Sequence, residues 1–253
     1  MTSNGKAKIV AENLTKVYET AQSTSLLVLS DMNAEIYDNE FVSIIGPSGC
    51  GKTTFLNIVA GLILPTRGRV LVDGKEVSGP GRERGVVFQQ DAILLWRKVL
   101  DNVAYGLEIR GVGRKERAAV ALDYLKLVGL EKFADFFPKE LSGGMKKKVQ
   151  IAAVLANTPE VMLMDEPFGS LDYLTKVELQ GELLRIWTQD PKTVLFITHD
   201  VEEAIFLSDR VLMMSKGKLE RGFKVPFERP RNNEIRARPE FHELKAELWR
   251  YLA

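Results

Sequence analysis

The chain has 253 residues, of which 45% are hydrophobic and 27% are charged, and its formal net charge is +1 at pH 7. This length and composition are enough for a sizeable buried core in one or two lobes. A net charge so close to zero gives no electrostatic footprint for nucleic acid or for anionic lipid. The single cysteine excludes an internal disulfide framework and suits a reducing compartment. No apolar run approaches the roughly twenty residues that cross a bilayer, and the polar segment 1–8 lacks the hydrophobic centre expected of a secretory signal.

The N-terminal part of the chain is predicted to be rich in β-strands. Apolar runs indicate strands at 9–14, 26–36, 40–45 and 86–88. Asp73-Gly74 lies between two further short runs, 69–72 and 75–77, and is the two-residue signal of a hairpin with a type I′ turn. We therefore expect antiparallel pairing in this region.

Residues 46–53, GPSGCGKT, match the phosphate-loop pattern G-x-x-x-x-G-K-[ST]. In such a loop, backbone N–H groups surround the nucleotide phosphates, Lys52 reaches the outer phosphates, and the Thr53 hydroxyl ligates magnesium. Gly46, Gly49 and Gly51 are expected to allow positive φ and a close approach of bare backbone to the phosphate oxygens. The residues predicted to contact the nucleotide in this segment are Gly46, Pro47, Ser48, Gly49, Cys50, Gly51, Lys52, Thr53 and Thr54.

The neighbours of this loop distinguish a nucleotide site from a glycine-rich turn without a ligand. A buried strand is predicted before the loop, and an apolar helix over 54–60, ending at Gly61, is predicted after it. Strand, loop and helix in this order favour ATP or GTP binding, because the positive end of the helix dipole then points at the phosphates. The same dipole is expected to favour the thiolate of Cys50, and we expect bound ATP to protect that thiol from alkylating reagents.

The character of the chain changes after Gln89. Helical spacing appears over 102–111 and over 115–128, where Gly129 provides a stop. Strand patterns then return, separated by helical stretches, at 161–164, 194–197 and 211–214. A helical insert of about sixty residues is therefore expected to interrupt an α/β core.

Two carboxylates follow the first of these returning strands. Asp165 and Glu166 come directly after the apolar run 161–164, and open α/β sheets place ligands at strand ends. Behind a phosphate loop, Asp165 is predicted to bind Mg²⁺ directly or through water, and Glu166 to polarise the attacking water. A solvated acidic turn is the ordinary alternative for such a strand end.

A Ser-Gly-Gly turn precedes a helix predicted over 146–156. Ser142 is placed as its N-cap, while Gly143 and Gly144 let a phosphate from another molecule approach the positive end of the helix. A capping turn with no further role is the alternative.

These segments, in this order and with these gaps, resemble the nucleotide-binding subunit of an ATP-binding cassette (ABC) transporter. The resemblance covers residues 8 to about 230 and includes the phosphate loop, Gln89, Leu141 to Gly144, Asp165-Glu166, Ser170 to Asp172 and Thr198 to Asp200. It implies an α/β fold with a P-loop NTPase (RecA-like) core, an antiparallel β subdomain and an inserted α-helical subdomain. One ABC ATPase domain, 1–253, is then expected to comprise a core with the β subdomain at 8–88 and 158–228, a helical subdomain at 89–157, and a short C-terminal linker and helix at 229–253.

The resemblance implies roles for further residues. Tyr18 is the aromatic that stacks on adenine, although an upstream tyrosine is equally compatible with a packed strand residue. Gln89 contacts the magnesium and the attacking water. Because Gln90 is also a glutamine, the match to the family's glutamine is ambiguous by one position. His199 bonds the terminal phosphate, and Asp172 acts across a dimer, with helix capping as the alternative. The implied catalytic residues are Glu166, His199, Gln89 and Lys52, and the implied metal ligands are Thr53, Gln89 and Asp165.

The mechanism of the resembled family implies a homodimer. ATP on the phosphate loop of one copy is contacted by Ser142, Gly143 and Gly144 of the other, so two Mg-ATP molecules close the dimer and hydrolysis opens it. The presence of Glu166 indicates a hydrolytic site. The implied partners are integral membrane permease subunits and, through them, a substrate-binding protein, and no nucleic acid is expected. The implied location is peripheral, on the cytoplasmic face of the bacterial inner membrane.

The chain resembles more narrowly the ATPases of importers for nitrate, sulfonates, taurine and related small anions or aromatic acids. The supporting segments are 79–89, 99–103 and 228–231. Two positions depart from that pattern. Leu95 precedes Trp96 where proline is usual, and Lys146 to Lys148 replace a mixture of arginine and glutamine. We expect these three lysines to solvate a helix face.

Two apolar patterns remain. The segment 92–96 is predicted to receive a short cytoplasmic helix of the permease, and burial in the core of the helical insert is the alternative. A terminal helix is expected to pack back on the core, with a membrane-surface helix as the competitor, through the stripe Phe241, Leu244, Leu248 and Leu252. A different class of function, a soluble ABC ATPase of the iron–sulfur assembly type, stays open.

Overall fold

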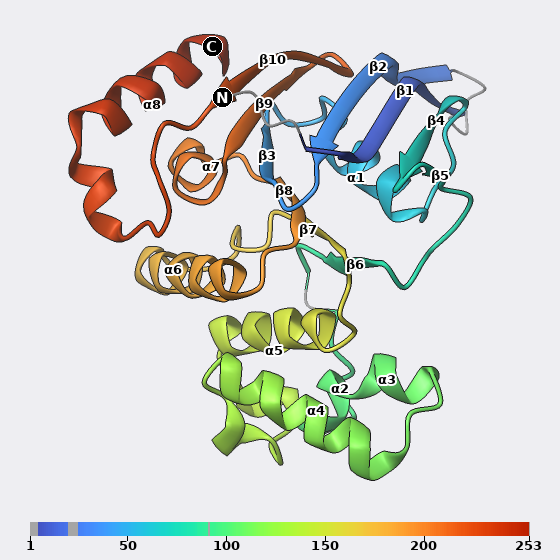
Figure 1. Cartoon of the computed structure of the whole chain (residues 1–253), viewed down its shortest axis with the longest axis vertical. Helices are drawn as coiled ribbons and strands as arrows, with labels where there is room; N and C mark the ends of the chain where they lie inside the picture. The colour runs from blue at the N-terminus through green and yellow to red at the C-terminus, as the bar shows by residue number, and fades with distance from the viewer. Residues whose placement is uncertain (1–4, 20–24, 91, 253) are drawn as a thin grey trace.

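The computed structural model describes residues 5–19, 25–90 and 92–252. Its strands form two sheets (Figure 1). The larger sheet has the strand order β10 (Lys218–Lys224), β9 (Arg210–Ser215), β3 (Phe41–Ile45), β8 (Thr193–Ile197), β7 (Val161–Asp165) and β6 (Arg84–Val87). The smaller sheet has the order β2 (Ser25–Tyr37), β1 (Ala7–Glu19), β4 (Arg67–Val72) and β5 (Lys75–Glu76).

Eight α-helices accompany these sheets within the described residues. They are α1 (Lys52–Ala60), α2 (Val99–Val103), α3 (Tyr105–Ile109), α4 (Arg114–Leu127), α5 (Gly143–Leu155), α6 (Tyr173–Gln189), α7 (Val201–Leu207) and α8 (Pro239–Leu252). Helices α2 to α5 gather at one end of the molecule, and the smaller sheet lies at the other end (Figure 1). Three short 3₁₀ turns lie at Glu131–Phe133, Pro138–Glu140 and Asn233–Ala237.

The central strands of the larger sheet are parallel and buried on both faces. Strands β3, β7 and β8 are buried along their whole length, as their continuous apolar sequences predict. Alternate residues of β7 enter different cores, because successive side chains of a strand point to opposite faces. Met162 and Met164 join the core that contains residues of α6 and α7, whereas Val161 and Leu163 join the core that contains residues of α1. The parallel arrangement brings the carboxyl ends of β3, β8 and β7 to one edge of the sheet.

The smaller sheet is antiparallel, as predicted. Strands β4 and β5 pair through Val72 and Lys75, and the two turn residues between them, Asp73 and Gly74, have φ of 50° and 76°. Positive φ at both positions is the property of a type I′ turn, so the hairpin prediction is confirmed. Residues of β1 and β2 share a core with Phe55 and Leu56 of α1, so this sheet covers the first helix.

The helical structure predicted over 102–111 is confirmed for most of that range, but its bounds are wrong. The chain forms two short helices, α2 and α3, which meet at Ala104. The buried side chain of Asn102 explains the earlier start, because its amide nitrogen donates to the carbonyl oxygens of Leu94, Arg97 and Lys98 and so organises the turn before α2. Helical periodicity does not reveal a polar residue whose side chain hydrogen-bonds the backbone of a preceding turn.

The C-terminal helix packs back on the core, as predicted. Phe241, Leu244 and Leu248 of α8 are buried in the core that contains α7. Arg231 holds the preceding linker in place, because its guanidinium donates to the carbonyl oxygens of Ile205 at 3.2 Å and Ser208 at 2.7 Å. Among the helices described in residues 5–252, none combines the length and the apolar content that crossing a bilayer requires.

Candidate functional site

The phosphate loop connects β3 to α1 and has the backbone of an anion cradle. Gly49 and Gly51 have φ of 78° and 109°, as predicted. The prediction of positive φ at Gly46 is wrong. Glycine is required at this position for a different reason, since a Cβ there would collide with the carbonyl oxygen of Met214 in β9. At Gly51 a Cβ would also lie 2.7 Å from Leu29 Cδ2. The loop is therefore pressed against neighbouring strands on its inner side, while Pro47, Ser48 and Gly49 remain exposed on its outer side.

Lys52 and Thr53 begin α1 and reach in different directions. The Lys52 ammonium is buried and donates hydrogen bonds to the carbonyl oxygens of Gly46 at 2.8 Å and Pro47 at 3.1 Å. A positive charge is thus held within the curve of the loop. The Thr53 hydroxyl donates to Asp165 Oδ1 at 3.1 Å. This bond joins the phosphate loop to the end of β7, although the two residues are far apart in the sequence.

Asp165 is a buried carboxylate beside this hydroxyl. Burial raises its pKa and the nearby negative charge of Glu166 acts in the same direction, while the hydrogen bond from Thr53 acts against them. A carboxylate that loses water in this way is stabilised by a cation next to it. A hydroxyl and a carboxylate are also the hard oxygen donors that Mg²⁺ prefers, so the residues present fit this metal.

Glu166 and His199 meet at the ends of β7 and β8. Glu166 has a positive φ of 42°, and its backbone N–H donates to the Ile197 carbonyl at 2.9 Å. Its Oε2 lies 3.1 Å from His199 Nδ1. Positive φ in a non-glycine residue costs free energy, and such residues gather at functional sites. The turn thus brings the Glu166 carboxylate to the His199 imidazole.

The sequence interpretation assigned no role to Asp200, the residue after His199. Asp200 caps α7 by accepting hydrogen bonds from the N–H groups of Glu202 at 2.9 Å and Glu203 at 3.2 Å. Lys176, on α6, donates to Asp200 at 2.8 Å. Burial acts to raise the pKa of Asp200, but the hydrogen bond and charge of Lys176 and the capping amides outweigh it and hold this pKa below its usual value. An Asp with Glu two and three residues later at a helix start signals a cap, but nothing in the sequence indicates the partner on α6.

The Ser-Gly-Gly turn and the Asp172 turn lie next to each other. Ser142 caps α5 by accepting from the Met145 N–H at 3.3 Å, and Asp172 caps α6 by accepting from the Thr175 N–H at 3.1 Å. Only glycine fits at position 144, because a Cβ there would lie 2.7 Å from Thr175 Cγ2. Ser142 is therefore the N-cap that was predicted, Asp172 is also a helix cap, and both caps sit in exposed turns where a second molecule has access.

Within the part of the chain that the structure describes, Gln89 and Tyr18 make no hydrogen bond with the phosphate loop or with the carboxylates at the strand ends. The Gln89 side chain is exposed, and the Gln89 carbonyl accepts a hydrogen bond from Lys147 at 3.2 Å. Tyr18 is half-exposed on β1, with Lys16 Nζ 5.0 Å from the centre of its ring.

Two sequence expectations about side-chain surroundings are wrong. Lys147 does not solvate a helix face, because it is buried in α5. The thiol of Cys50 is also buried, and this burial raises its pKa against the opposing charge of Lys52. The thiolate is thus disfavoured, because the loss of water outweighs the helix dipole and the nearby ammonium.

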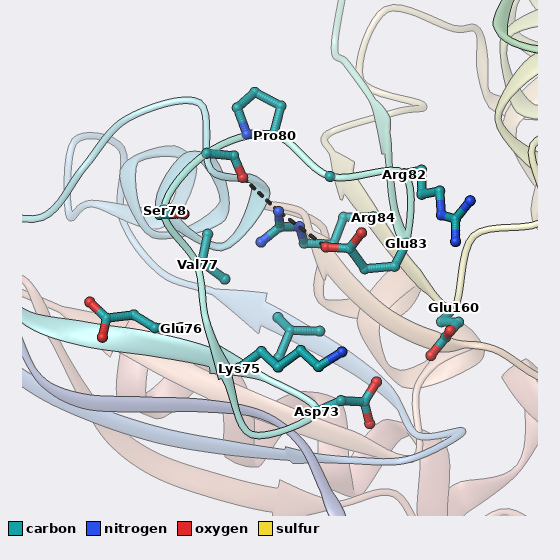
Figure 2. A pocket seen from close by; sticks show the side chains of 13 residues that line it. Asp73, Lys75, Glu76, Val77, Ser78, Pro80, Arg82, Glu83, Arg84 and Glu160 are labelled. Carbon is teal, nitrogen blue, oxygen red and sulfur yellow. Dashed lines mark hydrogen bonds and ion pairs between the residues drawn. The ribbon is translucent and has the colours of Figure 1, made fainter. Parts of the chain in front are cut away.

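A cavity of about 490 Å³ lies away from all of these residues, between β5 and the segment before β6 (Figure 2). Several of its charged groups are paired with one another or with neighbours. Arg84 donates to the Gly79 carbonyl and forms an ion pair with Glu83, as the dashed lines in Figure 2 show. Lys8 forms ion pairs with Asp73 and Glu160, which both line the cavity. None of the predicted site residues lines this cavity, so the candidate site is the edge of the larger sheet.

Comparison with known proteins agrees with this choice. The sequence pattern of the family described as ABC transporter matches residues 29–169. The chain belongs to this family. The match includes the phosphate loop, the Ser-Gly-Gly turn and the Asp165-Glu166 pair, and the chain is an ABC ATPase.

The relatives and structures most similar to the cassette include transport subunits. A taurine import ATP-binding protein of Rhizobium johnstonii is 48% identical over 227 residues, which cover 87% of this chain and 87% of the relative. A bicarbonate transport ATP-binding protein of Synechocystis sp. is 44% identical over 245 residues, which cover 94% of this chain and 86% of the relative. A solved dimeric ATP-binding cassette in a post-hydrolysis state, bound to ADP and Pi, matches at a TM-score of 0.77 and 35% identity, covering 87% of this chain and 100% of the other. The predicted fold class and the resemblance to importer ATPases are confirmed.

Proposed function

We propose that this cassette is the ATP-hydrolysing subunit of an importer, that it dimerises around two Mg-ATP molecules, and that it powers the import of a small anion through a membrane permease. The observation that carries the proposal is the meeting of three strand ends. There the phosphate loop bonds to Asp165 through Thr53, and Glu166 contacts His199. Phosphoryl transfer to water needs a phosphate cradle, a metal ligand and an oriented acceptor for the proton of the water, and this edge supplies each of them.

Each group has a task in this proposal. The loop amides and Lys52 bind the phosphates, and Tyr18 stacks on the adenine. Mg²⁺ would be held by Thr53, Gln89 and Asp165, and when bound it neutralises charge that develops on the phosphate oxygens. Glu166 orients a water molecule and accepts its proton, and His199 donates a hydrogen bond to the terminal phosphate.

The second half of each site is supplied by another copy of the chain. Ser142, Gly143 and Asp172 are exposed in neighbouring turns, and Gly144 lies buried behind them against Thr175. Tyr173 and Leu174, the next residues after Asp172, are 67% and 77% exposed. Exposed large apolar side chains beside polar turns are typical of a protein interface. The similar cassette bound to ADP and Pi is a dimer, which supports a homodimer here.

A substitution pair at Ser142 tests the shared site. Asp and Asn both cap helices well, so Ser142→Asp and Ser142→Asn are each expected to preserve α5. Only Asp places a negative charge where the triphosphate of the partner would lie. We expect Ser142→Asp to lower kcat for ATP hydrolysis about 100-fold relative to Ser142→Asn, with unchanged ATP affinity of the isolated protomer. Equal ATPase rates for the two variants, at equal thermal stability, would show that this turn does not face a phosphate.

The permease is proposed to dock beside the Gln89 segment. Leu95 and Trp96 are 61% and 75% exposed there, while Ile93 is buried, so the segment 92–96 is divided between a surface and the core. An adjoining groove of about 370 Å³ is lined by residues that include Phe88, Ile93 and Tyr105. An apolar groove next to an exposed tryptophan suits a short amphipathic helix. We place the cassette on the cytoplasmic face of the bacterial inner membrane, held there by this contact.

Trp96→Glu tests the docking surface. A buried interface anchor typically contributes 2 kcal/mol or more, so a charge at this position is expected to reduce transport in reconstituted vesicles about 30-fold or more. The ATPase rate of the isolated cassette is expected to stay within about twofold, because Trp96 touches none of the nucleotide-binding groups. Trp249→Glu, at an exposed tryptophan of α8, is the matched control. Normal transport by Trp96→Glu would place the permease elsewhere.

The transported solute is proposed to be a small anion such as nitrate, bicarbonate, a sulfonate or taurine, delivered by a substrate-binding protein. The support is the similarity to taurine and bicarbonate transport subunits. We also propose residues 89–157 as the helical subdomain, 8–88 with 158–228 as the core and its β subdomain, and 229–253 as the C-terminal linker and helix. Isolation of the cassette from detergent-solubilised membranes tests the importer assignment, which requires a multi-spanning subunit to accompany it.

A further inference from the structure

Helix α5 presents two buried polar side chains to the Gln89 segment. Lys147 is 1% exposed and Gln150 is 3% exposed, and they are three residues apart on one face of the helix. Burying an ammonium group costs free energy unless it is well hydrogen-bonded. A lysine in this position therefore requires partners that compensate for lost water.

The partners of Lys147 include two consecutive backbone carbonyls. Lys147 Nζ donates to the carbonyl oxygens of Phe88 at 3.0 Å and Gln89 at 3.2 Å, and to Gln150 Oε1 at 2.8 Å. The Gln150 amide nitrogen donates in turn to the Gln90 carbonyl at 3.4 Å. These carbonyls follow the end of β6, so no sheet ladder is there to fix them. A charged donor makes stronger hydrogen bonds than a neutral one, so the helix holds this segment firmly.

The same helix starts at Ser142. Lys147 lies five residues after the cap, which is about 7.5 Å along the helix axis. A helix this short moves as a rigid body. A shift of the Gln89 backbone is therefore transmitted through Lys147 to the turn that contains Ser142, and the reverse holds as well.

We propose that Lys147 is a positioning residue that fixes the Gln89 backbone, so that the Gln89 side chain reaches the water and the metal. Through helix α5, Lys147 also couples the position of the Gln89 backbone to that of the Ser142 turn. This inference rests on the role of Gln89 in the proposed function. Lys147 itself touches neither nucleotide nor water in this account. It acts through the two carbonyls that it binds.

The test compares steady-state ATP hydrolysis by the full chain with Lys147→Met and Lys147→Gln, and with Lys146→Met as the matched control on the same helix. Loss of the charged donor is expected to lower kcat about tenfold in both Lys147 variants while KM for ATP stays within about twofold, since the phosphate loop is untouched. Hydrogen exchange of the peptide containing Phe88 to Gln90 is expected to accelerate in the Lys147 variants. Lys146→Met is expected to match the unaltered chain in all three measurements. Unchanged kcat in both Lys147 variants, or a rise of KM with kcat preserved, would overturn the proposal.

A double-substitution cycle separates this inference from the role of Gln89. Gln89→Ala is expected to lower kcat by itself, and adding Lys147→Met to it is expected to cause no further loss, because both changes remove the same contribution. If Gln89→Ala lowers kcat and adding Lys147→Met lowers kcat further by the same factor as in the unaltered chain, the positioning role of Lys147 is wrong. The assigned role of Gln89 is then still supported. If Gln89→Ala leaves kcat unchanged, the assigned role of Gln89 is wrong, and the inference about Lys147 with it.

Discussion

Replacing Glu166 with Gln is expected to lower kcat for ATP hydrolysis roughly 100- to 10,000-fold, which is the usual contribution of general acid–base catalysis. The amide has nearly the shape of the carboxylate but cannot accept the proton of the attacking water. It can still hydrogen-bond to His199, which lies 3.1 Å from the carboxylate in the unaltered chain. ATP binding is therefore expected to survive, and an ATP-bound dimer is expected to accumulate because hydrolysis no longer opens it.

The measurement combines a phosphate-release assay with size-exclusion chromatography in the presence of Mg-ATP. Glu178→Gln is the matched control, because the Glu178 side chain is 71% exposed on α6 and the charge change is the same. The control should hydrolyse ATP normally and show no ATP-dependent dimer that persists through the column. A Glu166→Gln chain that remains monomeric in saturating ATP would contradict the shared site. Adding Ser142→Asp to Glu166→Gln should abolish the stable dimer while each protomer still binds ATP.

The second large effect is expected at Lys52. Lys52→Ala removes the positive charge that the loop carbonyls of Gly46 and Pro47 hold next to the phosphate cradle. Truncating one partner of a buried charge pair typically costs 2–5 kcal/mol, so ATP affinity is expected to fall roughly 30- to 5,000-fold. This loss affects the ground state, so binding weakens whether or not hydrolysis occurs.

Titration calorimetry with ATP in the Glu166→Gln background measures this loss without turnover. Lys115→Ala, on the exposed face of α4, carries the same charge change far from the loop and should bind ATP like the unaltered chain. Thermal unfolding must accompany the titration, because Lys52→Ala also leaves two loop carbonyls without their donor. Wild-type affinity in a folded Lys52→Ala chain would show that this ammonium does not reach the phosphates.

The elements that could be predicted from the sequence are those governed by local chemistry. The hairpin at Asp73-Gly74 follows from the two residue types that best tolerate positive φ in a two-residue turn. The strand β7 follows from an uninterrupted apolar run, and the burial of Phe241 and Leu248 follows from their helical spacing. In each case the residues that carry the pattern are close together in the chain.

The failed expectations each involve a neighbour distant in sequence. Gly46 needs no positive φ, and what requires glycine there is the carbonyl of Met214 on an adjacent strand. The Cys50 thiolate was expected from the nearby helix dipole, but burial among other elements raises the pKa of the thiol instead. Lys147 looked like one of three solvated lysines, yet the Gln89 segment covers it.

The sequence by itself determined the phosphate loop, the strand that ends in Asp165 and Glu166, the helix that Ser142 caps and the family to which the chain belongs. These follow from residue types at fixed short spacings, where backbone geometry and capping leave few choices. Only the tertiary structure decided that Thr53 bonds to Asp165, that Glu166 meets His199, and that Lys147 holds the Gln89 backbone. These contacts depend on which strands lie side by side in the parallel sheet and on which side chains lose their water when the sheet is covered. The spacing of residues along the chain specifies neither.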